Sequence, residues 1–218
     1  MEYCEVGRHH EHLVADMSTV VAFTRDGILN FHNQHVWADE NPYAVQETRH
    51  QDRFSINVWV GVLGDRLLGP YVLPQRLTGA RYHHFLNNIL PILMEDLPCQ
   101  DRLQMWFMHD GAPAHFLRIV HQHLTRKFEN RWIGRGGPIP WPARSPDLNP
   151  LDFWLWGYMK QLVYATPINN VQTLQHRVFH TAQHIQNQPG QFQRVRESLR
   201  RRAEACIEMN GHHVEHLL

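Results

Sequence analysis

The sequence predicts an α/β fold in which helices flank a mixed β-sheet. Short apolar segments with strand character occupy the first third of the chain, and one short apolar run lies between two helical segments in the middle. The last third has a helical pattern. The order strands, helix, strand, helix, helices favours a mixed sheet, and 218 residues suffice for one domain with a sizeable core.

The first strands are predicted from β-branched, aromatic and other apolar residues. Met17–Phe23 (MSTVVAF) and Gln34–Ala38 are expected to be strands, and Ile56–Leu63 (INVWVGVL) has the composition that strands favour. Gly64-Asp65 fits a two-residue hairpin turn, because glycine readily adopts positive φ. Arg66–Leu73 is then the returning strand of this hairpin.

The middle of the chain alternates helix and strand. Apolar residues at spacing four predict a helix over Ala80–Leu97, which Pro91 is expected to kink. The run Leu103–His109 (LQMWFMH) predicts a short buried strand. An amphipathic helix is expected over Pro113–Phe128. Its apolar face is predicted to consist of Phe116, Ile119, Val120, Leu124 and Phe128.

The segment Arg135–Asn149 (RGGPIPWPARSPDLN) is rich in Gly and Pro and is expected to be a loop. A helix should begin after it, since Asn149 suits the N-cap and Pro150 suits the first turn. Asp152 also suits this first turn, because an acid there complements the helix dipole. The helix should end near Thr166. Two further helices are predicted over Val171–Asn187 and Phe192–Met209.

The charge balance limits the classes of function. The chain has 21 Lys plus Arg and 21 Asp plus Glu, so it lacks the strongly basic balance that would argue for nucleic acid. Neutrality still allows an acidic metal site beside local basic patches. The three Cys residues lack zinc-ligand spacing and favour a reducing compartment. No signal peptide or membrane span is predicted.

Asp110 is the first candidate functional residue. It ends the predicted buried strand, and the carboxyl ends of central strands are where α/β proteins place functional groups. Gly111 and Pro113 follow at once and favour a sharp exit of the chain from the strand. Asp-Gly turns are common, so a simple turn aspartate is the alternative interpretation.

Asp152 is the second candidate. Its carboxylate could serve only the helix dipole, and Asp147 in the preceding loop is a rival acid. Two carboxylates that converge from different elements would suit Mg²⁺ or Mn²⁺, because these cations prefer oxygen ligands. A divalent-metal site at Asp110 and Asp152 is therefore the hypothesis that the sequence raises.

Two stretches around these aspartates resemble mariner-type transposases. His109–His115 (HDGAPAH) is similar to the second-aspartate motif of that family. Trp141–Asp152 (WPARSPDLNPLD) is similar to its third-carboxylate motif, in which the last residue is the metal ligand. The ending Asn210–Leu218 also resembles the end of insect members. The resemblance implies a ribonuclease-H-like mixed sheet with a helical C-terminal extension, and it assigns metal ligation to Asp152 rather than Asp147.

The resemblance also implies a chemistry and a set of partners. Three carboxylates of the family fold hold two divalent metals, which cut and join DNA by in-line phosphoryl displacement. The implied cofactor is Mg²⁺ or Mn²⁺, expected here to bind weakly or at a single site. The implied partner is DNA, without a membrane or a small-molecule substrate, and a homodimer is allowed. A nuclear location is implied, or a cytoplasmic one, because no targeting signal is recognised.

One of the three family carboxylates is missing from its expected place. Aligning Phe23–Gly27 (FTRDG) with the similar stretch of the family puts Thr19 at the position of the first aspartate. A neutral hydroxyl cannot replace a carboxylate that bridges two dications. Asp16 lies three residues earlier, and an odd shift along a strand points a side chain to the opposite face of the sheet. Rescue by Asp16 is therefore not expected.

The resemblance also divides the chain. It assigns residues 17–165 to the catalytic core and 166–218 to a helical extension of the same domain, and it leaves 1–16 unassigned. Only 18 residues precede Thr19, so the helix-turn-helix DNA-binding domain of the family is not expected in this sequence.

Three functions remain open. The favoured one is a transposase-derived nucleic-acid-binding protein with impaired catalysis. The second is an active metal-dependent endonuclease in which Asp16 or Glu40 supplies the missing acid. The third is a protein-interaction module that kept only the fold.

Overall fold

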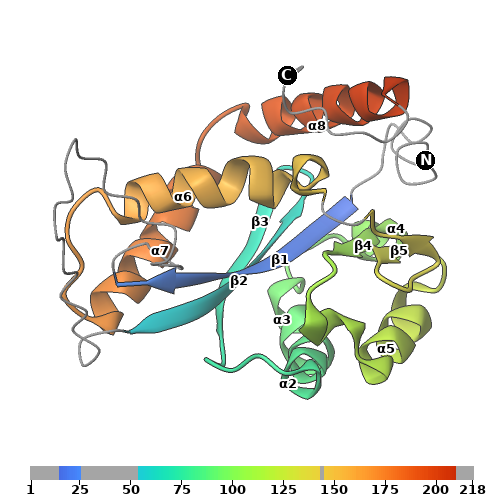
Figure 1. Ribbon diagram of the computed structural model, residues 1–218, viewed down its shortest axis with the longest axis horizontal. Coiled ribbons are helices and arrows are strands. Elements are labelled where there is room, and N and C mark those ends of the chain that lie inside the picture. The colour runs from blue at the N-terminus through green and yellow to red at the C-terminus, as the bar shows by residue number, and fades with distance from the viewer. Residues whose placement is uncertain (1–14, 26–53, 143–144, 210–218) are drawn as a thin grey trace, which may run out of the picture.

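The computed structural model describes residues 15–25, 54–142 and 145–209 (Figure 1). The strands are β1 (Ala15–Thr24), β2 (Ser55–Leu63), β3 (Arg66–Leu73), β4 (Trp106–His109), β5 (Trp132–Gly134) and β6 (Ile139–Pro140). The α-helices are α2 (Gly79–His84), α3 (Leu90–Leu93), α4 (Cys99–Gln104), α5 (Arg118–Phe128), α6 (Trp156–Val163), α7 (Val171–Gln186) and α8 (Gln191–Glu208). Short helical segments are η3 (Phe85–Ile89), η4 (Pro113–Phe116), η5 (Pro146–Leu148) and η6 (Leu151–Leu155).

These strands form one mixed sheet in the order β3-β2-β1-β4-β5-β6. The first three are antiparallel neighbours, whereas β4 runs parallel to β1 and pairs Ser18 with His109. β5 and β6 continue in the parallel direction. The predicted α/β fold with a mixed sheet is confirmed, and β1 and β4 lie side by side at its centre. The predicted strand Gln34–Ala38 lies outside the described residues.

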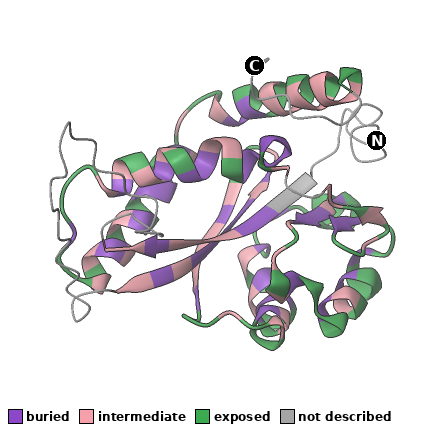
Figure 2. Cartoon of the chain, in the orientation of Figure 1, coloured by how far each residue is buried: buried purple, intermediate pink, exposed green. Residues whose placement is uncertain are grey.

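A hydrophobic core covers each face of the sheet. Figure 2 shows buried residues alternating with half-buried ones along the strands. On one face, α6 and α7 contribute the buried side chains of Met159, Leu174 and Val178 against β2 residues such as Val58. On the other, α2, η3 and α5 pack against β2, β4 and β5. The buried residues of that second core include Trp59, Tyr82, Phe85, Phe107, Leu124 and Trp132. Apolar side chains alternate between the two cores along each strand, as the pleat requires.

Several predicted elements are confirmed close to their predicted bounds. β2 and β3 form the expected hairpin, in which Gly64 has φ 58°. α7 and α8 match the two predicted C-terminal helices.

The helix predicted over Ala80–Leu97 is wrong in its continuity and its end. It is divided into α2, η3 and α3, and it ends at Leu93. The Leu90 N–H donates to the Phe85 carbonyl, which makes η3 a π-helical turn. Pro91 follows at once and has no N–H of its own, so the irregularity lies where the sequence predicted a kink.

Two other boundaries also differ from the sequence prediction. The strand predicted from Leu103 begins at Trp106, because Leu103 lies in α4 with 64% of its side chain exposed. The helix predicted over Pro113–Phe128 is interrupted at Leu117, where ψ is 139°. Phe116 and Ile119 consequently lie outside the buried face that Val120, Leu124 and Phe128 form.

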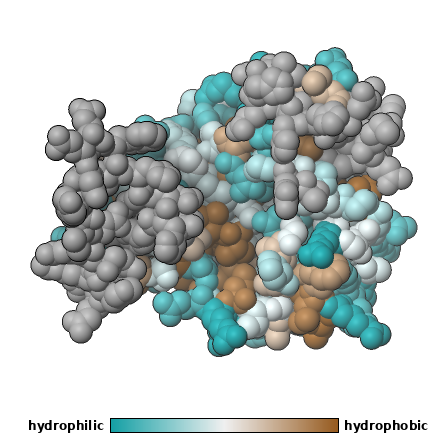
Figure 3. Space-filling view, viewed as in Figure 1, coloured by the Kyte–Doolittle hydropathy of each residue, from teal (hydrophilic) through white to brown (hydrophobic). Residues whose placement is uncertain are grey.

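The segment predicted as loop over Arg135–Asn149 also contains the short strand β6 and the 3-10 turn η5. β5, just before it, was not predicted; its three residues are too few to show a period. Within the described part of the chain, no helix has the length and apolarity that a membrane span needs. Figure 3 shows exposed hydrophobic side chains over the region of α2, α3 and α5, where Ile92, Leu117 and Ile119 are exposed.

Candidate metal centre

The two candidate aspartates lie on different elements beside the centre of the sheet. Asp110 follows β4 directly, and Asp152 lies in η6, which contacts β1. Because Ser18 pairs with His109 across β1 and β4, the next residue of β1, Thr19, lies beside Asp110. The Thr19 hydroxyl donates a hydrogen bond of 3.2 Å to Oδ2 of Asp110.

The other oxygen of the Asp110 carboxylate is held by its own loop. Oδ1 accepts from the backbone N–H of Ala112 at 3.0 Å and lies 2.8 Å from Nδ1 of His115. Burial acts to raise the pKa of Asp110, but the contacts with His115, Ala112 and Thr19 outweigh it and lower that pKa below its ordinary value. Asp110 is therefore an ionised carboxylate with donors on both oxygens, although 29% of its side chain is exposed.

His115 lies in the 3-10 turn η4, and its Nδ1 also lies 3.2 Å from the backbone carbonyl oxygen of Asp110. Its imidazole is 2% exposed and stacks on His109, with ring centroids 4.7 Å apart and planes at 4°. The Tyr82 hydroxyl lies 3.3 Å from Nδ1 of His109. Burial, and next the neighbouring His115, hold the pKa of His109 well below its ordinary value, so His109 is neutral.

Glycine at position 134 lets β5 approach this histidine pair. A Cβ on Gly134 would lie 2.5 Å from two ring atoms of His109, which is too close for any side chain. Nε2 of His109 and Nε2 of His115 are buried without a hydrogen-bond partner among the described residues. β5 and α2 thus enclose the pair of histidines, and His115 of this pair contacts the Asp110 carboxylate.

Asp152 is held by the residue that the sequence predicted as the helix N-cap. The Asn149 side-chain oxygen accepts from the Leu151 N–H at 3.1 Å, and its nitrogen donates to Oδ2 of Asp152 at 2.7 Å. Enclosure of the Asp152 carboxyl raises its pKa; the Asn149 amide opposes this, and the negative charge of Asp110 adds to it. The negative charge of Asp110 thus acts on Asp152, whereas Asp147 lies buried in η5.

These side chains supply only part of the ligands that a hard cation needs. Asp110 and Asp152 offer carboxylate oxygens, and Thr19 offers a neutral hydroxyl. Among the described residues, no group of three His, Cys, Asp or Glu side chains is placed to hold a metal ion. Glu40 lies outside the described residues, and so does the side chain of Asp16.

Sequence reasoning missed two parts of this site. In the sequence His115 stands out only as the last residue of the motif His109–His115, and its position five residues after Asp110 was the available signal for its role. The hydrogen bond from the Asn149 amide to Asp152 was not predicted either. The place of Asp152 three residues after the predicted N-cap was the available signal.

Comparison with known proteins gives two sequence relatives. The chain is 34% identical over 80 residues to the Tc3 transposable-element transposase of Caenorhabditis elegans, which covers 36% of this chain and 22% of that protein. It is 24% identical over 159 residues to the Tcb1 transposase of Caenorhabditis briggsae, covering 72% of this chain and 53% of that protein. The chain thus spans about half or less of the length of these relatives. No protein-family model matches it.

The fold also has solved counterparts. The catalytic domain of the Mos1 mariner transposase superposes with a TM-score of 0.69 at 19% identity, over 98% of this chain and 93% of that domain. A likeness at this identity establishes the fold, which is the ribonuclease-H-like mixed sheet that the resemblance implied.

Proposed function

We propose that this chain, which is related to the mariner-type transposases, is a nucleic-acid-binding relative of their catalytic core with impaired DNA cleavage. The observation that carries the proposal is the hydrogen bond from Thr19 to Asp110. It supports the alignment that puts a neutral residue at the place of the first family aspartate. A hydroxyl donor on Oδ2 uses a lone pair of the carboxylate and adds no negative charge.

The residues present fit one divalent cation better than two. Structures of the Mos1 catalytic domain with Mg and with Mn support the use of divalent metal in that family. Here Asp110 and Asp152 supply two negative charges, which are too few to hold two dications close together against their repulsion. We therefore assign Asp110 and Asp152 as ligands of a single, weakly bound Mg²⁺ or Mn²⁺, and we derive no cleavage step through a metal pair.

DNA is the partner that the proposal names. Mos1 has been solved in paired-end complexes with transposon DNA, which supports DNA as the ligand of this fold and allows a dimer. A protein that acts on DNA would work in the nucleus. The domain division at residue 165 stays a prediction, although α7 packs in the same core as α6.

A plasmid-nicking assay in Mn²⁺ tests the proposed impairment. Wild type, Thr19→Asp, Thr19→Asn and Asp110→Ala are compared on supercoiled DNA. We expect no useful nicking by wild type, because the bridging charge is missing. Thr19→Asp should bind Mn²⁺ more tightly than wild type in a titration, because the new carboxylate replaces a hydroxyl beside Asp110. Thr19→Asn has nearly the same shape as Thr19→Asp but lacks the charge, so it should not bind Mn²⁺ more tightly than wild type.

Two results would contradict the proposal in different ways. Robust nicking by wild type that disappears in Asp110→Ala would mean that another acid, such as Asp16 or Glu40, completes the site. Failure of wild type to bind either DNA or Mn²⁺ would favour the protein-interaction module instead.

A further inference from the structure

An exposed aromatic ring follows the candidate site directly in the sequence. Phe116 ends η4, one residue after the histidine that holds Asp110, and 46% of it is exposed. The guanidinium carbon of Arg135 lies 4.3 Å from the centre of its ring. Arg135 directly follows Gly134, which packs against His109. In the sequence, each member of this cation–π pair thus directly follows a residue of the site: Phe116 follows His115, and Arg135 follows Gly134.

The pair is positioned by tight backbone contacts. Gly136 has φ 75°, and a Cβ there would lie 2.9 Å from the His121 ring and 3.3 Å from the Phe116 ring. The loop after β5 can therefore come this close only with glycine at 136. His121 meets Phe116 edge to face, with ring centroids 5.2 Å apart at 75°, and it also contacts Trp132 at 5.5 Å.

The break in the helix at Leu117 turns Phe116 outward. Leu117 is extended, and a Cβ on Gly79 would come within 2.6 Å of the Leu117 Cβ, so α2 holds the break in place. A continuous helix would have placed Phe116 with Val120 on the buried face. An apolar ring that is nearly half exposed despite the guanidinium over it is suited to a ligand with a flat face.

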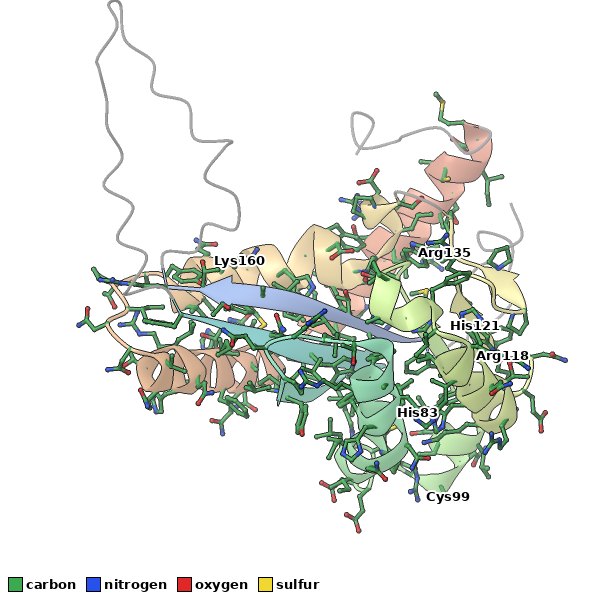
Figure 4. All side chains as sticks on the ribbon, turned by 60° about the horizontal axis from the view of Figure 1, so that its bottom comes forward. His83, Cys99, Arg118, His121, Arg135 and Lys160 are labelled. Carbon is green, nitrogen blue, oxygen red and sulfur yellow. The ribbon has the colours of Figure 1, made fainter. Side chains whose placement is uncertain are left out.

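Two arginines lie close to this ring: Arg135 lies over it, and Arg118 follows Phe116 by two residues in the chain. Arg118 and Arg135 are both exposed, and Figure 4 shows them with His121 on the same side of the molecule, on α5 and on the segment after β5. Among the residues that the structure describes, no acid lies in the first turn of η4 or of α5. The charge therefore suits an anionic partner.

We propose that Phe116 and Arg135 form a stacking platform for an unpaired base of a DNA strand that lies at the Asp110–Asp152 site. The proposal rests on the proposed function and specifies its ligand. The ring of Phe116 stacks on the base, and Arg135 and Arg118 contact the flanking phosphates. Stacking on an aromatic ring beside arginine is how proteins hold unpaired nucleotides without reading their sequence.

The test compares two DNA ligands on the full chain. One is a blunt duplex, and the other is the same duplex with a single-stranded overhang that carries 2-aminopurine. Wild type should bind the overhang at least about fivefold more tightly than the blunt duplex, as one stacked base predicts. Binding should also quench the 2-aminopurine, because stacking quenches its fluorescence.

Matched variants separate the platform from general binding. Phe116→Leu should remove both the preference and the quenching, whereas Phe116→Trp should keep them. Phe179→Leu is the control, because Phe179 is also 46% exposed but lies on α7. Arg135→Gln should weaken DNA binding and reduce the slope of log affinity against log salt concentration by about one. Arg102→Gln on α4 should change neither the affinity nor the slope.

Each contrary result has its own meaning. Equal behaviour of Phe116→Leu and Phe179→Leu, in a protein that still binds DNA, would overturn the platform and leave the proposed function intact. Absence of any DNA binding by wild type at low salt would overturn both. Displacement of the oligonucleotide by polyglutamate as readily as by unlabelled DNA would overturn the assignment to nucleic acid and point to an acidic peptide.

Discussion

The two aspartates differ in how the protein treats their charge. Asp110 has donors on both oxygens, and its pKa is lowered by them, so its negative charge is stabilised by the fold. Asp152 accepts a hydrogen bond from Asn149, and its pKa is raised by enclosure and by Asp110. The negative charge of Asp110 thus stabilises the folded protein. The negative charge of Asp152 destabilises it, and a bound cation would offset that effect. A metal ligand need not stabilise the protein without its metal.

Replacing each carboxylate by an amide should therefore change stability in opposite directions. Asp152→Asn should raise Tm slightly at neutral pH, because it removes a repelled charge and keeps an oxygen for the Asn149 amide. Asp110→Asn should lower stability by on the order of 1–3 kcal/mol, because an amide N–H would face existing donors. Thermal melts in chelator measure both.

The pH dependence of stability tests whether the Asp152 charge destabilises the folded protein. A carboxyl with a raised folded-state pKa loses its stabilising effect as pH rises from the ordinary value of 3.8 through that raised pKa. The advantage of Asp152→Asn over wild type should appear only above that range. An equal advantage at lower pH would contradict the charge argument.

At the scale of elements, the sequence predicted the β2–β3 hairpin and the helix irregularity beside Pro91, but not the helix break at Leu117. β-Branched and aromatic residues together with the Gly64-Asp65 turn were enough to predict the β2–β3 hairpin, and Asn149 correctly marked the helix that carries Asp152. The break at Leu117 depends on contact with Gly79, which is distant in sequence. The contact between His115 and Asp110 depends on the 3-10 turn η4, which contains His115. Local periodicity cannot predict features that tertiary contacts impose.

The contact between α2 and α5 should make the protein sensitive to acid. The rings of His83 and His123 lie 5.2 Å apart at 85°. Burial, then His83 and the cations Lys127 and Arg126, lower the pKa of His123 from 6.5 to about 4. The unfolded chain therefore binds more protons than the folded one between these values, and acidification over that range favours unfolding.

His123→Gln should reduce this acid sensitivity. Its loss of Tm between pH 6.5 and 4 should be smaller than that of wild type, because the imidazole that resists protonation is gone. His180→Gln, at an exposed position of α7, is the control and should follow wild type. Identical acid profiles for His123→Gln and wild type would show that other histidines carry the effect.

For the whole molecule, the sheet joins two cores that lie on its opposite faces. α7 belongs to one core through Leu174, and α5 belongs to the other through Leu124; both side chains are fully buried. Gln186 at the end of α7 also completes the hairpin of β2 and β3: its side chain accepts from the Leu67 N–H at 2.6 Å and donates to the Asp65 carbonyl at 3.0 Å. These contacts connect α7 to the sheet.

We therefore predict that both cores unfold in one transition. Leu174→Ala and Leu124→Ala should each cost about 2–5 kcal/mol, since each leaves a cavity in a close-packed core. Each variant should shift the urea midpoint equally whether unfolding is followed by far-UV circular dichroism or by tryptophan fluorescence, because the shared strands transmit either loss to the other face. If Leu174→Ala instead released α7 and α8 in an earlier step, with the Leu124 core still folded, the C-terminal helices would be a separate unit. The β2–β3 hairpin would then lose its Gln186 contacts without losing its pairing with β1, and amide exchange at Leu67 would rise alone.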